Sequence, residues 1–120
     1  MNLARTAIIE QTNAHRRGYG LNPYKRSSTL DAYAQAYANR IARGEIPYGH
    51  SGINVYENLH RVDDPTDAYK GCVAGWKNSP GHNRNMLQSG AYYQGIGLAK
   101  MTTEDHWLCV AMYSAEDGVM

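Results

Sequence analysis

Two histidines and one glutamate have the residue types and surroundings of a metal site. His82 follows a Ser-Pro-Gly turn, His50 lies between a glycine and a serine, and Glu57 stands in a short apolar segment. Imidazole nitrogens and carboxylate oxygens are common zinc ligands, and two histidines with one glutamate match several hydrolytic zinc sites that leave a fourth position open for water. The three residues therefore predict a site for zinc or another divalent ion.

The position of His82 favours a neutral imidazole. If Ser79 caps a helix and Pro80 is its first residue, His82 occupies the third helical position. The partial positive charge at the helix start then lowers the pKa of His82, and a neutral imidazole is the form that binds a metal or accepts a proton. The alternative is that this motif only starts a helix and that His82 lies on the surface.

Glu57 needs a partner, and His50 is a candidate. Alternation along the predicted strand puts Glu57 on the same face as Val55 and Leu59, where an unpaired carboxylate is very costly to bury. His50 is in a glycine-flanked loop, so its role as a ligand depends on His82 and Glu57. Asn58 is expected to point to the opposite face and to anchor a loop through backbone hydrogen bonds.

Support for catalysis is weaker than support for binding. No motif places a second acid to act as a general base, and His60 is expected to face away from Glu57. Ser51 and Ser79 are adjacent to the histidines, but neither lies in a nucleophile elbow. A zinc-dependent hydrolase using Glu57 and His82 is the alternative to a non-catalytic site.

Length and charge limit the classes of protein. The chain has 120 residues and a net charge of +1 with scattered charges, which predicts one domain over residues 1–120 and no nucleic-acid partner. No apolar run approaches the roughly 20 residues of a membrane span. The N-terminus carries Glu10 early and does not resemble a signal peptide. A cytoplasmic location, another export route, and a mature fragment with an added Met1 are all compatible.

Cys72 and Cys109 are the two cysteines, and both lie in apolar patterns. We expect buried free thiols rather than a disulfide, because an unpaired cysteine behaves as a small hydrophobic residue. The chain has ten tyrosines and no phenylalanine, so its large core side chains carry hydroxyl groups that need partners.

The apolar periodicity predicts helices early and strands late. A continuous apolar stripe from Leu30 to Ile41 includes Tyr33 and Tyr37, with a capping box at Ser28 to Asp31 and a stop at Gly44. Three more helices are predicted: one over Leu3–Arg17, one that begins at Asp64–Pro65, and one from Ser79–Pro80 to near Gly90. The inward face of the helix that begins at Asp64–Pro65 is expected to carry Tyr69, Cys72, Val73 and Trp76. Strands are predicted over Ile53–Leu59, Tyr92–Met101 and His106–Ser114.

The last predicted strand is apolar on both faces and must be covered on both. This predicts an α+β fold, a three-layer α-β-α sandwich with a central antiparallel sheet of about three strands and four helices. Gly95 and Gly97 on one strand indicate a close approach by a neighbouring element.

Several motifs in order resemble the CAP superfamily, also called the SCP or pathogenesis-related-1 family, in its compact bacterial or phage-type branch. The matching pieces are Asn13-x-x-Arg16, Leu30…Ala34…Ala38, His50, Glu57-Asn58-Leu59, Trp76-x-x-Ser-Pro-Gly-His82-x-x-Asn-Met-Leu and Gly95-Ile-Gly97.

The resemblance implies a central cleft in which two histidines and two glutamates can bind zinc or another divalent ion. The implied ligand positions correspond to His50, Glu57 and His82 in this chain, whereas Lys77-Asn78-Ser79 stands where the second glutamate is expected. We therefore expect a non-catalytic module that binds a divalent metal and an unknown small ligand or protein at the cleft. The alternatives are a metal-dependent hydrolase of peptide or cell-wall bonds and a structural or assembly component of phage or bacterial origin. A lipid or sterol ligand would need an apolar groove that the sequence does not locate, and the oligomeric state stays open.

Overall fold

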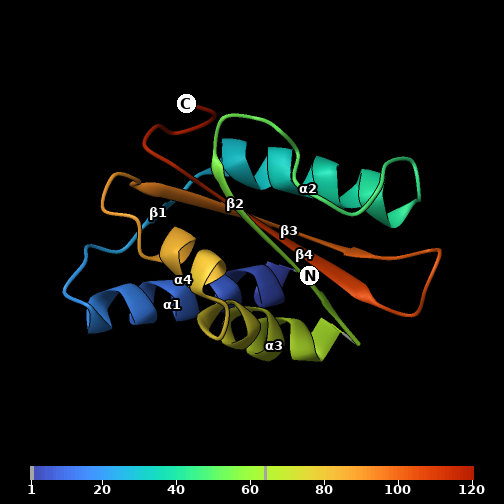
Figure 1. Ribbon diagram of the computed structural model, residues 1–120, viewed down its shortest axis with the longest axis horizontal. Helices are drawn as coiled ribbons and strands as arrows, with labels where there is room; N and C mark the ends of the chain where they lie inside the picture. The colour runs from blue at the N-terminus through green and yellow to red at the C-terminus, as the bar shows by residue number, and fades with distance from the viewer. Residues whose placement is uncertain (1, 64) are drawn as a thin grey trace.

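The computed structural model describes residues 2–63 and 65–120 and has three layers (Figure 1). Helix α2 covers one face of a sheet, and α1, α3 and α4 cover the other. The helices are α1 (Asn2–Gly18), α2 (Ser28–Ala42), α3 (Pro65–Lys77) and α4 (Pro80–Met86), and the strands are β1 (Lys25–Arg26), β2 (Tyr56–Val62), β3 (Tyr93–Lys100) and β4 (Trp107–Ser114). The predicted α+β sandwich is confirmed.

The sheet has the order β1-β3-β4-β2, with β1 parallel to β3 and the other pairs antiparallel. The prediction of about three strands omitted β1, because a strand of two residues carries no periodicity. Strand β2 starts three residues later than predicted and continues to Val62, so His60 lies within it. The fourth helix ends at Met86 rather than near Gly90.

Helix α2 is capped one residue earlier than predicted. The side chain of Ser27, not Ser28, accepts a hydrogen bond from the backbone N–H of Leu30 at 3.0 Å. Asp31, the predicted capping-box acid, instead accepts from the N–H of Ile96 on β3 at 2.8 Å. The predicted stop is confirmed, since Gly44 has a φ of 76° and its N–H reaches the carbonyl of Ile41.

Helix α2 lies directly on β3 at Gly95 and Gly97. A Cβ atom on Gly95 would approach the backbone of Leu30 and Asp31 to 2.3 Å, and one on Gly97 would approach the backbone of Ala34 to 2.4 Å. The predicted close approach is thus confirmed, and it sets the spacing between this helix and the sheet.

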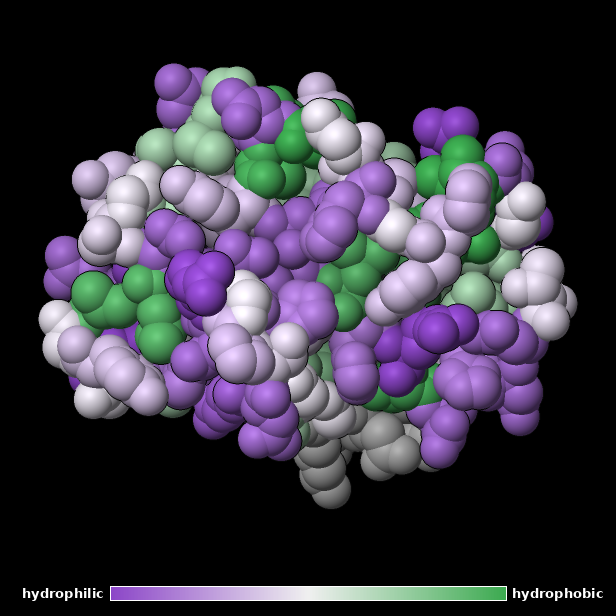
Figure 2. Space-filling view, in the orientation of Figure 1, coloured by the Kyte–Doolittle hydropathy of each residue, from purple (hydrophilic) through white to green (hydrophobic). Residues whose placement is uncertain are grey.

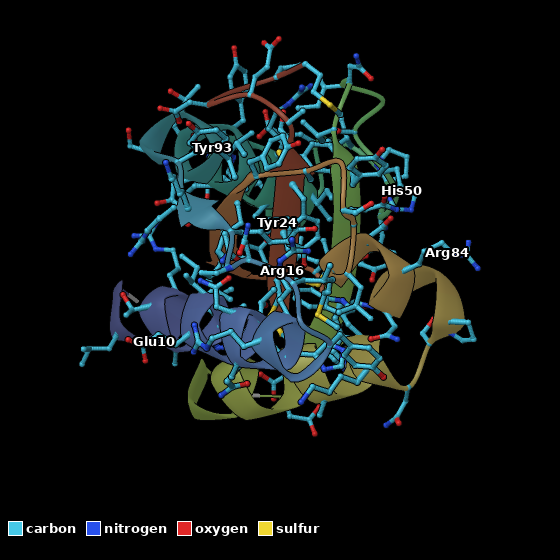
Figure 3. The ribbon with its side chains drawn as sticks, turned by 90° about the vertical axis from the view of Figure 1, so that its left-hand side faces the viewer. Glu10, Arg16, Tyr24, His50, Arg84 and Tyr93 are labelled. Carbon is cyan, nitrogen blue, oxygen red and sulfur yellow. A yellow bond between two sulfur atoms is a disulfide. The ribbon has the colours of Figure 1, made fainter. Side chains whose placement is uncertain are left out.

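Each face of the sheet has its own core, one against α2 and one against α1, α3 and α4. In the second core, the guanidinium carbon of Arg16 lies 3.7 Å from the ring centre of Tyr24 (Figure 3), and its nitrogens donate to the carbonyls of Asn22, Met86 and Gln88. Burial raises the pKa of Tyr24 to about 12. Arg16 therefore fixes the chain between α4 and β3.

A disulfide joins Cys72 on α3 to Cys109 on β4, so the expectation of free thiols is wrong. Both cysteines are fully buried where α3 packs on the sheet, and their Cα atoms are 6.6 Å apart, within the range a disulfide can span.

The predicted inward positions of Val73 and Trp76 on α3 are confirmed. The predicted cap Asp64 and the side chain of Tyr69 lie outside the described part of the chain. No described helix has the length and apolar character needed to cross a bilayer.

We predict that reduction of the Cys72–Cys109 disulfide lowers the free energy of unfolding. The two residues are 37 apart in sequence, and opening a loop of that length costs about 3–4 kcal/mol in the chain-entropy model. Urea unfolding with and without reductant measures the change, and the Cys72→Ala/Cys109→Ala variant controls for direct effects of the reductant on the rest of the chain. Equal midpoints in both conditions would contradict the assignment.

Candidate functional site

Glu57 is buried on the α2 side of β2 and accepts three hydrogen bonds. Its Oε1 atom accepts from the N–H of Ser51 at 2.8 Å and from Nδ1 of His50 at 3.0 Å, and its Oε2 atom accepts from the hydroxyl of Ser51 at 2.7 Å. The residue is only 6% exposed. These bonds explain how the core tolerates a carboxylate there, and they fix residues 50 and 51 against β2.

The hydrogen bond to Glu57 determines which nitrogen of His50 is free. A carboxylate accepts hydrogen bonds, so in the neutral imidazole of His50 the proton is on Nδ1 and the lone pair is on Nε2. The side chain of His50 is 66% exposed. It projects beside β2 on the same side of the molecule as α4 (Figure 3).

Asn58, the next residue of β2, holds α4 on the opposite face of the sheet. Its Nδ2 atom donates to the backbone carbonyl of His82 at 3.0 Å, and its Oδ1 atom accepts from Nδ2 of Asn85 at 3.0 Å. Asn58 is fully buried. The predicted anchoring role is confirmed in kind, but the element it anchors is the start of α4.

His82 lies where the sequence predicted, after the N-cap Ser79 and with Pro80 as the first helical residue. Its pKa is lowered by partial burial and then by the positive charge of His50. The sequence had predicted that the helix N-terminus lowers this pKa, whereas in the structure burial and His50 lower it. The consequence is the same, a neutral imidazole near neutral pH.

The structure brings His50 and Glu57 into contact and leaves His82 separate. Among the described residues, no three histidine, cysteine, aspartate or glutamate side chains are arranged to hold a metal ion together. His82 and His50 are near enough for electrostatic coupling. A metal-ligating histidine commonly donates its other N–H to a carboxylate, and His50 makes such a bond to Glu57.

His60 was predicted to face away from Glu57, and it does, on the same face as Asn58. Its ring lies against Gly75 of α3, where an added Cβ atom would meet Nε2 at 2.9 Å. Its pKa is lowered by burial and then by the charges of His82 and Arg61. His60 had no predicted role, although a position on the same strand face as Asn58 could have placed it near α4.

Two cavities meet at His50. One of about 280 Å³ is lined by His50, Tyr56, Glu57 and Asn85 and opens between β2 and α4. The other, of about 490 Å³, lies between α2 and residues 46–53. The first is the candidate metal cleft, because it contains the carboxylate-bound imidazole and borders the helix that carries His82.

Comparisons with known proteins agree with this fold. The model of the cysteine-rich secretory protein family, CAP, matches residues 9–113. No curated protein matches the sequence.

Solved structures with similar folds come from bacteria and a parasitic worm. An outer surface protein from Borrelia burgdorferi is 19% identical with a TM-score of 0.66, and the match covers 90% of each chain. An extracellular SCP-domain protein from Bacillus anthracis is 16% identical with a TM-score of 0.70, over 94% of this chain and 41% of that one. Venom allergen-like protein 4 from Schistosoma mansoni is 15% identical with a TM-score of 0.72, and the match covers 96% of this chain and 91% of that one. At these identities the likeness shows the fold.

We predict that Glu57→Gln destabilises the protein by about 1–3 kcal/mol, because it weakens charge-assisted hydrogen bonds to a buried acceptor. Glu45→Gln is the matched control, since Glu45 pairs with Arg43 on the surface and exposed pairs contribute about 0–1 kcal/mol. Urea unfolding measures both variants. Equal losses would show that the buried hydrogen bonds of Glu57 do not hold the site.

We predict that the protein loses stability as the pH falls below about 6.5, the ordinary pKa of a histidine side chain. The folded pKa of His60 is lowered mainly by burial, so the unfolded chain binds protons more readily and stability falls until the pH passes the folded pKa. His82 contributes with the same sign. His60→Gln should therefore make the decline between about pH 7.5 and pH 5 shallower, measured by urea midpoints in EDTA. An unchanged slope would contradict this role of His60.

Proposed function

Because the chain belongs to the CAP family, we propose that it is a non-catalytic binding module whose cleft holds a divalent metal ion on the imidazoles of His50 and His82. The observation that carries the proposal is the bond between Nδ1 of His50 and the buried carboxylate of Glu57. It leaves Nε2 of an exposed imidazole available beside α4, where His82 is kept neutral. Zinc accepts neutral imidazole nitrogens as ligands.

Glu57 has a positioning role in this proposal rather than the ligand role expected from the sequence. Three hydrogen bonds already use three of the roughly four acceptor sites on its two oxygens, so Glu57 is engaged mainly in holding Ser51 and His50. With two protein ligands, a bound ion would keep positions open for water or for an oxygen atom of a partner. That open coordination supports recognition at the cleft.

The surroundings of the cleft favour binding over hydrolysis. A metal-dependent hydrolase needs a base that takes a proton from the attacking water. Glu57 is the one acidic residue among the described residues that line the two cavities at His50, and it already accepts three hydrogen bonds from Ser51 and His50. Lys77 and Asn78 stand where the family resemblance placed a second carboxylate.

We predict that zinc raises the melting temperature of the metal-free protein. At a free zinc concentration of one hundred times Kd, binding adds about 2.7 kcal/mol to the free energy of unfolding. This corresponds to a rise in melting temperature on the order of 10 °C for a domain of this size. His50→Ala and His82→Ala should each remove most of the shift. Glu57→Gln should weaken zinc binding roughly 10–100-fold without abolishing it.

His106→Ala is the control for this experiment, since His106 lies near Asp63 and Glu104 at the other end of β2. A zinc shift that survives both site variants, or no shift in the unmutated protein, would contradict the two-imidazole site. Turnover of peptide or peptidoglycan substrates that a chelator suppresses would replace binding with the hydrolase alternative. Stable self-assembly would favour the structural alternative.

A further inference from the structure

A groove runs along α2 and meets the candidate metal cleft at His50. Figure 1 shows the segment that joins α2 to β2 passing back along the helix, and the two enclose a cavity of about 490 Å³. Tyr33 and Tyr48 line it and are 49% and 42% exposed, and Ile53 and the buried Met112 are part of its apolar lining. On the face drawn in Figure 2, hydrophobic residues reach the surface in several separate patches.

The sequence placed Tyr33 and Tyr37 on the apolar stripe of α2. In the structure Tyr33 is exposed and Tyr37 packs partly against the core, and both line this groove. The hydroxyl of Tyr37 donates to the carbonyl of Gly49, and Glu57 holds Ser51. These bonds join the opposite wall to the helix and to the sheet. The groove is therefore formed before any ligand arrives, which lowers the entropic cost of binding.

The charge in the groove is positive at one end. Arg40 lines it, and no acidic side chain among the described residues does so. Arg40 is exposed and forms no ion pair within the described part of the chain, whereas Arg43, on the next turn, pairs with Glu45 at 2.6 Å. An arginine without a carboxylate, beside tyrosines, suits a ligand that carries both a carboxylate and an apolar group.

The groove is longer than one side chain. A second hollow of about 470 Å³ continues along α2 past Tyr33 and shares Tyr33 and Ala36 with the first, ending at Ser28 and Thr29. The helix rises about 16 Å between positions 29 and 40. An extended chain covers that length with about five residues.

We propose that this groove binds the C-terminal end of an extended peptide, with the terminal carboxylate on Arg40 and the last apolar side chain between Tyr33 and Tyr48. The preceding residues lie along Ala36 and Ala32 toward Thr29. A guanidinium holds a carboxylate through charge-assisted bonds, and half-exposed tyrosines commonly anchor peptides and proteins. The site needs no metal ion, although His50 stands at its rim.

The test uses fluorescein-labelled pentapeptides that end in leucine or phenylalanine, each as the free acid and as the C-terminal amide. Fluorescence polarisation is measured with the intact protein in EDTA. We expect the free acids to bind at least about tenfold more tightly than the amides. Arg40→Gln should remove that difference, and Arg43→Gln should preserve it.

Tyr33→Ala should weaken binding of the free acids, and Tyr19→Ala is its control, because Tyr19 is exposed at the end of α1. All four substitutions are at exposed residues, and unchanged melting temperatures verify folding. Equal affinity for acid and amide, insensitivity to Arg40→Gln, or no binding at millimolar peptide would overturn the proposal. If octanoate binds as tightly as the peptides and displaces them, the ligand is a small amphiphilic acid, and the peptide proposal is also overturned.

The outcome is separable from that of the metal proposal. Arg40→Gln should leave the zinc-induced rise in melting temperature intact, and EDTA should leave peptide binding intact. Failure of one measurement therefore does not decide the other.

Discussion

The candidate site depends on two neighbouring residues of β2, Glu57 and Asn58. Their side chains point to opposite faces because side chains alternate along a strand. Glu57 holds Ser51 and His50 on the α2 side, and Asn58 holds the backbone of His82 on the other. Two consecutive positions thus connect the central layer to both elements that carry the imidazoles.

The same strand is an edge of the sheet, and side chains from the helical layer cover its free carbonyl groups. The indole N–H of Trp76 donates to the carbonyl of Leu59, and the amide of Asn85 donates to the carbonyl of Glu57. An uncovered edge would leave these groups without partners and would invite pairing with another chain. The edge is therefore protected by the elements that form the cleft, so stability and cleft geometry depend on common contacts. The exposed His50 is consequently presented by a framework in which Glu57 and Asn58 are already hydrogen-bonded.

The sequence was sufficient wherever a local pattern had a local cause. The apolar stripe of α2, the Ser79–Pro80 start of α4 and the paired glycines of β3 all follow from periodicity or sterics. The requirement that Glu57 have a partner also followed, because a carboxylate in an apolar strand is costly to bury.

The features that the sequence could not predict depend on which distant segments of the chain lie next to each other in the fold. The Cys72–Cys109 disulfide requires α3 and β4 to be adjacent, and residues 37 apart carry no sign of that adjacency. Ser51, the main partner of Glu57, lies in a loop without periodicity. The pKa of His82 also depends on burial and on His50, which are tertiary features.

The protonation of the imidazole nitrogens of His50 tests most directly whether Glu57 orients the site. Long-range ¹H–¹⁵N correlation spectra of the metal-free protein at about pH 8 distinguish the two neutral tautomers. The geometry predicts that His50 carries its proton on Nδ1 and leaves Nε2 unprotonated. A proton on Nε2 would mean that Glu57 does not accept from His50, and the proposed two-imidazole site would lose its basis.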